Sequence, residues 1–238
     1  MILKKLAESI RLQNWFVVVL EILIVVIGIF IGLQVDDWNS RRIELKLEAD
    51  YLEQLAQETD HNLVVYQKNA EYSDTNEALT LAYYRYLNGE GVARPAEPKL
   101  LRMLCHPGFV SSPPYDNSVL EEMIASGMLA RLQDIKLRSA LANYRATQKV
   151  WDQLVVDSSD EYKKIFSFID QFRQWRPATK EEGFGNCTID FQALESHERA
   201  LTYVANYQRF KLWYHINYTE IADILEKVRE ILPSASSE

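Results

Sequence analysis

The strongest hydrophobic pattern in the chain is an unbroken apolar run from Trp15 to Val35, in which 17 of 21 residues are apolar. The four exceptions are Glu21, Gly28, Gly32 and Gln34. As a helix, this run is about 31 Å long, the thickness of a bilayer core. Its 16 Val, Ile, Leu and Phe residues each favour insertion by about 0.3 to 0.6 kcal/mol, which outweighs roughly 3 kcal/mol for one Glu. The pattern predicts a transmembrane helix over residues 15–35.

A secretory signal peptide and a buried core helix are also apolar, but neither fits this run. A signal peptide has a shorter apolar stretch and a small-x-small cleavage site, whereas this run continues into QVDDWNSRR. A core helix seldom stays apolar on every side for about six turns. Trp15 and Trp38 are about 34 Å apart on a helix, so we expect them to anchor it at the two membrane interfaces.

The flanking charges leave the orientation of the helix nearly balanced. Three basic residues lie on each side of the run: Lys4, Lys5 and Arg11 before it, and Arg41, Arg42 and Lys46 after it. The positive-inside rule therefore gives a tie. A short basic N-terminus ahead of a long acidic domain favours a cytoplasmic N-terminus. We expect a bacterial inner-membrane protein with its C-terminal domain in the periplasm.

One face of the predicted transmembrane helix carries Glu21, Gly28 and Gly32. At 100° per residue the two glycines lie within about 20° of the direction of Glu21. Two glycines at this spacing let helix backbones approach closely, and a carboxyl on the same face would be buried in a helix contact. We expect self-association through this face. Two alternatives stay open: a chance match with Glu21 reaching the headgroups, or a role for Glu21 in binding an ion or proton.

Beyond the membrane the apolar residues recur every three or four positions, which is the period of packed helices. This pattern predicts a helix from Arg41 to about Tyr72, a new helix start at Ser73–Glu77 capped by Asp74, and an end at Asn88–Gly89. Two further long helices are predicted at 134–172 and 191–232. The sequence thus predicts an all-α protein, in which an N-terminal transmembrane helix continues into an antiparallel bundle of about four principal helices.

Five of the seven prolines lie between residues 89 and 117, so this segment is predicted to be a connector with one short helix near 99–105. A short helix at 119–126 should follow. The connector is longer than ordinary connections, which makes it the candidate functional loop of the body. The predicted organisation is a basic cytoplasmic stub at 1–14, the transmembrane helix at 15–35, the extramembrane bundle at 36–232 and a disordered tail at 233–238.

Composition and charge exclude several classes of protein. The formal charge is −8, and an acidic body repels phosphate backbones, so nucleic acid is not an expected partner. The four histidines form no metal-binding spacing, and no P-loop, dinucleotide-binding or GxSxG motif occurs. The segment Glu195–Glu198, ESHE, is predicted to be the exposed first turn of a helix. We therefore expect no catalytic residues, no metal and no cofactor.

The two cysteines, Cys105 and Cys187, fall in or beside the two long loops. If the body lies outside the cytoplasm, a disulfide between them would close a loop of about 80 residues and add roughly 3 to 5 kcal/mol. The alternative is a pair of unpaired buried thiols. We expect the thiols, and keep the disulfide as a possibility.

Two segments resemble an uncharacterised bacterial family of single-pass membrane proteins. The first is EILIVVIGIFIGLQVDDWNSR at 21–41, similar to a family pattern of a Glu, an aliphatic run with Gly, then Gln and Trp-Asn. The second is YDNSVLEEMIASGMLARLQDIKLRSALANY at 115–144. Asp36–Asp37 depart from the Asn-rich residues of the pattern. The resemblance implies bacterial origin, a cytoplasmic N-terminus and helical architecture, and it implies no activity.

These observations together predict a membrane-anchored, non-enzymatic accessory, sensory or scaffold protein. Its expected partners are the lipid bilayer and a second copy of the chain or another membrane protein. The alternative function is a subunit of a transport or energy-coupling complex that uses Glu21. An enzyme with its active site near the 89–117 connector is a third, less favoured hypothesis.

Overall fold

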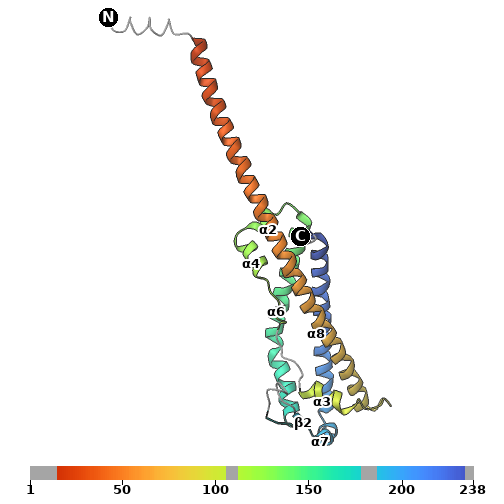
Figure 1. The fold of residues 1–238 in the computed structure, drawn as a ribbon. Coiled ribbons are helices and arrows are strands. Elements are labelled where there is room, and N and C mark those ends of the chain that lie inside the picture. The colour runs from red at the N-terminus through yellow and green to blue at the C-terminus, as the bar shows by residue number, and fades with distance from the viewer. Residues whose placement is uncertain (1–14, 106–111, 178–186, 234–238) are drawn as a thin grey trace, which may run out of the picture. The chain divides into compact units, whose positions relative to one another are not determined.

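A computed structural model describes residues 15–105, 112–177 and 187–233 of the chain, and in these ranges nearly all regular structure is helical (Figure 1). The all-α class and the long N-terminal helix followed by further helices are confirmed. In chain order the elements are α2 (Trp15–Leu87), α3 (Glu97–Cys105), α4 (Ser118–Ala125), α5 (Met128–Arg131), α6 (Ile135–Asp170), β1 (Arg173–Trp175), β2 (Cys187–Ile189), α7 (Phe191–Ser196) and α8 (Ala200–Ile231).

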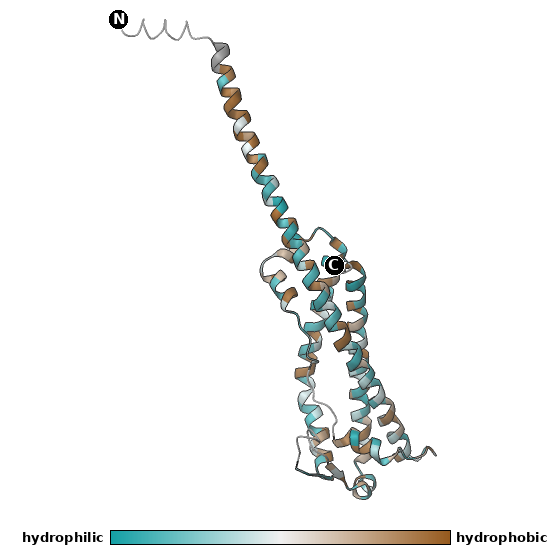
Figure 2. Cartoon of the chain, viewed as in Figure 1, coloured by the Kyte–Doolittle hydropathy of each residue, from teal (hydrophilic) through white to brown (hydrophobic). Residues whose placement is uncertain are grey.

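The chain divides into two compact units, residues 1–51 and 52–238. The first contains the apolar part of α2, whose side chains from Val19 to Val35 are exposed. Figure 2 shows this part as a mostly apolar stretch with a few pale or polar interruptions, followed by polar turns. The second unit holds the core and all the tertiary contacts considered below.

The predicted helix start at Ser73–Glu77 is wrong, because α2 continues through these residues to Leu87. Ser73, Asn76 and Thr80 are buried, so tertiary packing holds this stretch in place. The amide of Asn76 donates to the carbonyl oxygen of Tyr72 at 2.7 Å, within the same helix. The two residues of the predicted capping signal contact α8 instead: Asp74 lies 4.0 Å from Nε2 of His215, and Glu77 accepts from the amide of Gln208. The described residues of the second unit consequently contain three long helical segments, where the sequence predicted about four principal helices.

The three long segments of the second unit are the C-terminal part of α2, α6 and α8. α2 and α6 run in the same direction and α8 runs antiparallel to both (Figure 1). The predicted helix at 134–172 is confirmed with nearly the same bounds, and Asp134 caps it by accepting from the backbone N–H groups of Lys136 and Leu137. Its seam is buried as predicted over most of its length, including Trp151, which is 1% exposed.

The predicted last helix is two helices, because the chain turns between Ser196 and Ala200. The ring of His197 lies edge-on to Phe168 and Phe172 of the α6 end, with centroid distances of 5.1 and 5.6 Å. The aromatic contacts hold this turn against the bundle. The loop predicted before it contains an antiparallel pair, in which Trp175 of β1 lies opposite Cys187 of β2; its Gly183 and Gly185 lie outside the described residues.

Because α2 and α6 run in parallel, the chain between them must return along the length of the bundle. The predicted short helix of this connector is confirmed as α3. The predicted helix at 119–126 is confirmed as α4, and an additional short helix, α5, follows after Gly127, whose φ of 73° is left-handed. Residues 112–117, which we call the strap, lead into α4 and lie against both α2 and α6.

Candidate functional site

The apolar part of α2 is long and apolar enough to cross a membrane. Its most apolar window has a mean hydropathy of 2.3, and none of that window is buried. A core helix of a soluble protein would instead be covered on at least one side. Trp15 begins α2, and the ring of Trp38 is 64% exposed, with the guanidinium of Arg42 at 5.9 Å from its centroid.

The predicted contact face of Glu21, Gly28 and Gly32 lies within this exposed stretch. A Cβ atom added at either glycine would meet nothing within 4 Å. The surface around both glycines is therefore open, and a second helix could approach the backbone there.

Cys105 and Cys187 form a disulfide, with their Cα atoms 5.6 Å apart. The expectation of two unpaired thiols is wrong, and the alternative that the sequence left open is the one observed. Cys105 ends α3, and Cys187 begins β2, so the bond ties the connector to the strand pair across 82 positions. Both residues are buried, at 4% and 3% exposure.

A buried polar network connects the strap to α2 and α6. Asn62 of α2 makes a pair of hydrogen bonds with the backbone of Asp116: its amide donates to the carbonyl oxygen, and its Oδ1 accepts from the N–H at 2.8 Å. The same amide donates to Oδ1 of Asn117 at 3.2 Å. A side chain that hydrogen-bonds to both the N–H and the C=O group of one residue fixes the position of that residue.

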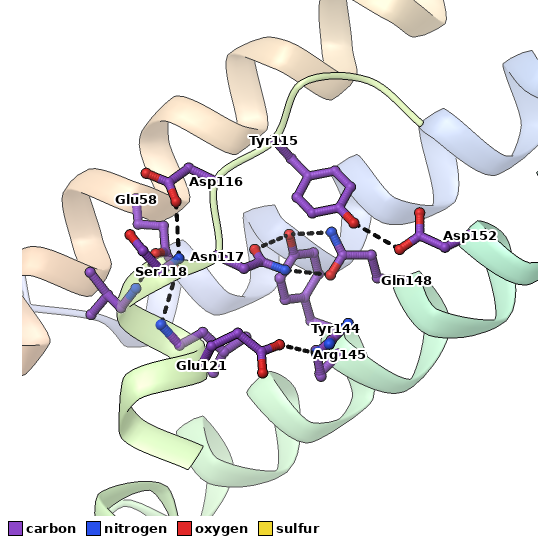
Figure 3. A network of polar contacts seen from close by, with 12 residues as sticks. Glu58, Tyr115, Asp116, Asn117, Ser118, Glu121, Tyr144, Arg145, Gln148 and Asp152 are labelled. Atoms are coloured by element: carbon purple, nitrogen blue, oxygen red, sulfur yellow. Dashed lines mark hydrogen bonds and ion pairs between the residues drawn. The ribbon is translucent and has the colours of Figure 1, made fainter. Parts of the chain in front are cut away.

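Asn117 extends this network into α6 (Figure 3). Its amide donates to Oε1 of Gln148, and its Oδ1 accepts from the hydroxyl of Tyr144 at 2.9 Å. Gln148 is fully buried and donates in turn to the hydroxyl of Tyr66 at 3.3 Å. Every one of these polar groups therefore has a partner in the low-dielectric interior, where an unpaired group would be costly.

The exposed edge of the strap is held by Asp152 of α6. Its carboxylate accepts from the hydroxyl of Tyr115 at 2.7 Å and from the hydroxyl of Ser112. Burial, together with this hydrogen bond to a carboxylate, raises the pKa of Tyr115 to about 12. The phenol consequently remains a donor across the physiological pH range.

Glu58 of α2 lies beneath the start of α4. Its Oε2 accepts from the backbone N–H of Val119 at 2.6 Å, and its Oε1 accepts from that of Leu120 at 3.3 Å. These are N–H groups of the first turn of α4, which have no partner within the helix. Glu58 therefore caps α4 from a different helix. Burial raises the pKa of its carboxyl to about 7, although the two hydrogen bonds favour the charged form.

A second buried ionisable group, Lys211, lies in the aromatic core of the bundle. Its ammonium is 3.4 Å from the hydroxyl of Tyr162 and between 5.2 and 5.9 Å from the ring centroids of Tyr72, Tyr162 and Tyr207. These faces provide cation–π attraction. Burial nevertheless lowers the pKa of Lys211 to about 8.

The prediction that Glu195–Glu198 is the exposed first turn of a helix is wrong, because Glu195 and Ser196 end α7, His197 is its C-cap, and α8 begins at Ala200. Glu195 accepts from the guanidinium of Arg94 at 2.7 Å and from the hydroxyl of Tyr83 at 3.2 Å. Arg94 also lies over the ring of Phe191 at 4.6 Å. This contact fastens the connector, the end of α2 and α7 together.

The residues of the described chain offer no group of three or more His, Cys, Asp or Glu side chains placed to hold a metal ion. His215 contacts the carbonyl oxygen of Ala70 at 3.1 Å, and His61 is exposed on α2. His106 lies outside the described residues.

Sequence reasoning missed Glu58, Asn62, Asn117 and Lys211 as important residues. In the sequence, Glu58 and Asn62 precede the buried Thr59 and the half-buried Leu63, and Lys211 follows the buried Phe210. Polar residues beside a seam are ordinarily solvent-exposed. Their burial depends on the strap and on the aromatic cluster, neither of which a helical period can indicate.

Comparison with known proteins returns no relative: no family model matches the chain, and no curated protein or solved structure is significantly similar to it. The described residues define its class by architecture, an all-α protein whose long N-terminal helix carries a stretch able to span a membrane. The resemblance to a bacterial family stays a prediction.

Proposed function

We propose that this protein is a membrane-anchored, non-enzymatic accessory, sensory or scaffold protein that assembles through its transmembrane helix. The observation that carries the proposal is the exposed apolar stretch of α2, on a chain whose second unit has a buried core among its described residues. Exposed apolar surface of this extent needs a lipid or protein environment. Lipid is the environment that its length fits.

The disulfide supports a location of the body outside the cytoplasm. Disulfides persist in oxidising compartments such as the bacterial periplasm and are rare in the cytosol. The bond between Cys105 and Cys187 joins elements of the second unit. We therefore place the N-terminus in the cytoplasm and the body in the periplasm of a bacterial inner membrane.

The non-enzymatic part of the proposal rests on how the buried polar groups are used. Glu58 hydrogen-bonds the first turn of α4, Asp152 hydrogen-bonds the strap, and Gln148 hydrogen-bonds Asn117. Groups that hold the fold together in this way are committed to internal partners. We therefore assign them a structural role.

Single-cysteine crosslinking tests assembly through the Glu21, Gly28 and Gly32 face. The native cysteines are already bonded, so a cysteine introduced at Gly28 is the reactive thiol, and Phe30→Cys, 62% exposed on another side of the helix, is the matched control. We expect Gly28→Cys to form disulfide-linked dimers in native membranes and Phe30→Cys to form few. Equal crosslinking of both variants would refute this contact face.

Thiol labelling tests the orientation independently. Val156 on α6 is 65% exposed, so Val156→Cys should react with a membrane-impermeant maleimide in intact spheroplasts. Labelling that requires lysis would place the body in the cytoplasm and contradict the proposal.

The transport alternative depends on Glu21, a carboxyl within the exposed apolar stretch. Charged residues at membrane depth face protein or water and often mark ion pathways. This alternative predicts that Glu21→Gln abolishes an ion or proton flux and leaves crosslinking at Gly28→Cys intact. Loss of crosslinking without any flux phenotype favours the structural role.

A further inference from the structure

The contact between Glu58 and α4 combines two features that seldom occur together. The carboxyl is buried, with the residue 7% exposed, and it is one of the groups that hold a separate segment onto the bundle. The segment consists of the strap and the first turn of α4, which rest on α2 and α6 through side-chain contacts. Its attachment therefore depends in part on the state of the buried Glu58, beside the contact that the carboxylate of Asp152 makes with Tyr115 and Ser112 at the exposed edge of the strap.

The charged groups around Glu58 do not neutralise it. From the strap and α4, Asp116 and Glu121 add negative charge, and both raise the pKa of Glu58 further. On α6, Arg145 pairs with Glu121, and Tyr144 is a neutral phenol. On α2 itself His61 lies one turn away and is exposed, while Arg229 of α8 pairs with Asp60 at 2.6 Å.

We propose that Glu58 is a pH-sensitive latch, which holds the strap and α4 on the bundle at mildly acidic pH and weakens that hold as the pH rises to neutral and above. The proposal goes beyond the proposed function and stands on the second unit alone, so it does not depend on membrane orientation or on assembly.

The direction of the pH dependence follows from the exposure of Glu58, which is buried when the strap is closed and reaches solvent when the strap opens. With the strap in place, burial favours the neutral carboxyl, which still offers its carbonyl oxygen to the N–H of Val119. When the strap opens, Glu58 becomes exposed and its pKa returns toward the ordinary value of 4.5, from about 7. The closed form therefore binds the proton more tightly than the open form. Closure is strongest below pH 4.5 and is progressively lost as the pH rises through 7.

The other hydrogen bonds between the strap and the bundle limit how much the charge on Glu58 can change the opening equilibrium. The hydrogen bonds of Asn62 and Asn117 involve amides, and these do not titrate. They keep the strap predominantly closed at every pH, so Glu58 changes how often it opens and not whether the body is folded. From the two pKa values, the opening equilibrium should increase roughly 70-fold between pH 5 and pH 8.

Amide hydrogen exchange of the full chain in lipid nanodiscs measures this opening directly. Protection factors of the α4 amides, corrected for intrinsic exchange, should fall by tens-fold between pH 5 and pH 8, while those of the α6 core stay level. In Glu58→Gln, a permanently neutral isostere, they should not depend on pH. Glu71→Gln, an exposed carboxyl on the same helix, should behave as the wild type.

Two results would overturn the proposal. One is a wild-type protection profile with the same pH dependence as that of Glu58→Gln. The other, which requires no substitution, is a carbon-13 titration of the Glu58 carboxyl in the wild-type chain with its midpoint near 4.5. A midpoint near 7 together with the predicted exchange profile supports the latch.

Discussion

Asn62 and Asn117 are 55 positions apart in the sequence, and their side chains hydrogen-bond to each other at 3.2 Å in the core of the second unit. Asn62 comes from the middle of α2, and Asn117 is the last residue before α4. The bond joins the strap to the one helix that also carries the apolar stretch. The strap is thus part of the core and not a loose connection.

Removal of this contact should destabilise the body strongly. Asn62→Ala leaves both backbone groups of Asp116 without their side-chain partner and removes one hydrogen bond of the buried Asn117 side chain, which should cost about 2 to 4 kcal/mol. The matched control is Asn69→Ala on the same helix, where the amide bonds only to the carbonyl oxygen of Val65 one turn back. Urea unfolding followed by circular dichroism should show a large shift for the first variant and a small one for the second.

The disulfide should contribute more to stability than any single hydrogen bond. The double variant Cys105→Ser/Cys187→Ser opens a loop of 82 positions. In the chain-entropy model, its free energy of unfolding should be about 4 kcal/mol lower than that of the wild type. A reductant should lower the unfolding midpoint of the wild type and leave the double variant unchanged. An equal response of both proteins to the reductant would show that the bond does not form.

The sequence predicted the elements that depend on local periodicity. α6 repeats apolar residues at helical spacing over its whole length and starts at a capping aspartate, so its bounds could be predicted. The apolar stretch of α2 was equally clear, because its length and composition alone make it able to cross a membrane. These features need no knowledge of neighbouring segments.

The sequence could not predict features that arise from contacts between distant segments. Ser73 and Asn76 are polar residues at a predicted break, yet both are buried within the continuous α2, and burial by other elements leaves no mark in the helical period. Glu58 and Asn62 look like surface residues of a helix until the strap covers them. The pairing of Cys105 with Cys187 likewise depends on where α3 and β2 meet, which spacing alone leaves open.

Lys211 should make the free energy of unfolding vary with pH in the alkaline range. Its pKa is lowered from 10.5 to about 8 in the folded state, so folding favours the neutral amine. The contribution of Lys211 to the free energy of unfolding is most favourable above pH 10.5 and is lost as the pH falls through 8. The free energy of unfolding differs by roughly 3 kcal/mol between these two limits. Lys211→Met fills the same volume without a charge and should be equally or more stable at pH 7.

The measurement for Lys211 is the difference in unfolding free energy between wild type and Lys211→Met at several pH values from 7 to 10. Using the difference removes the titration of the buried tyrosines, which both proteins share. We expect the variant's advantage to shrink as the pH rises. An advantage that stays constant with pH would mean that Lys211 titrates normally in the folded protein.

The corner between α4 and α5 should tolerate substitution according to backbone conformation alone. Gly127 has a φ of 73°, and a Cβ atom there would meet nothing within 4 Å. Gly127→Ala should therefore cost about 1 to 2 kcal/mol through the left-handed backbone and not through a clash. Gly127→Asn should cost less, because asparagine adopts this conformation more readily, and Gly127→Val should cost more. Thermal unfolding of the three variants should rank them Asn, Ala, Val in decreasing stability. A different order would mean that the corner rearranges, which the burial of Met123 and Met128 on either side of it opposes.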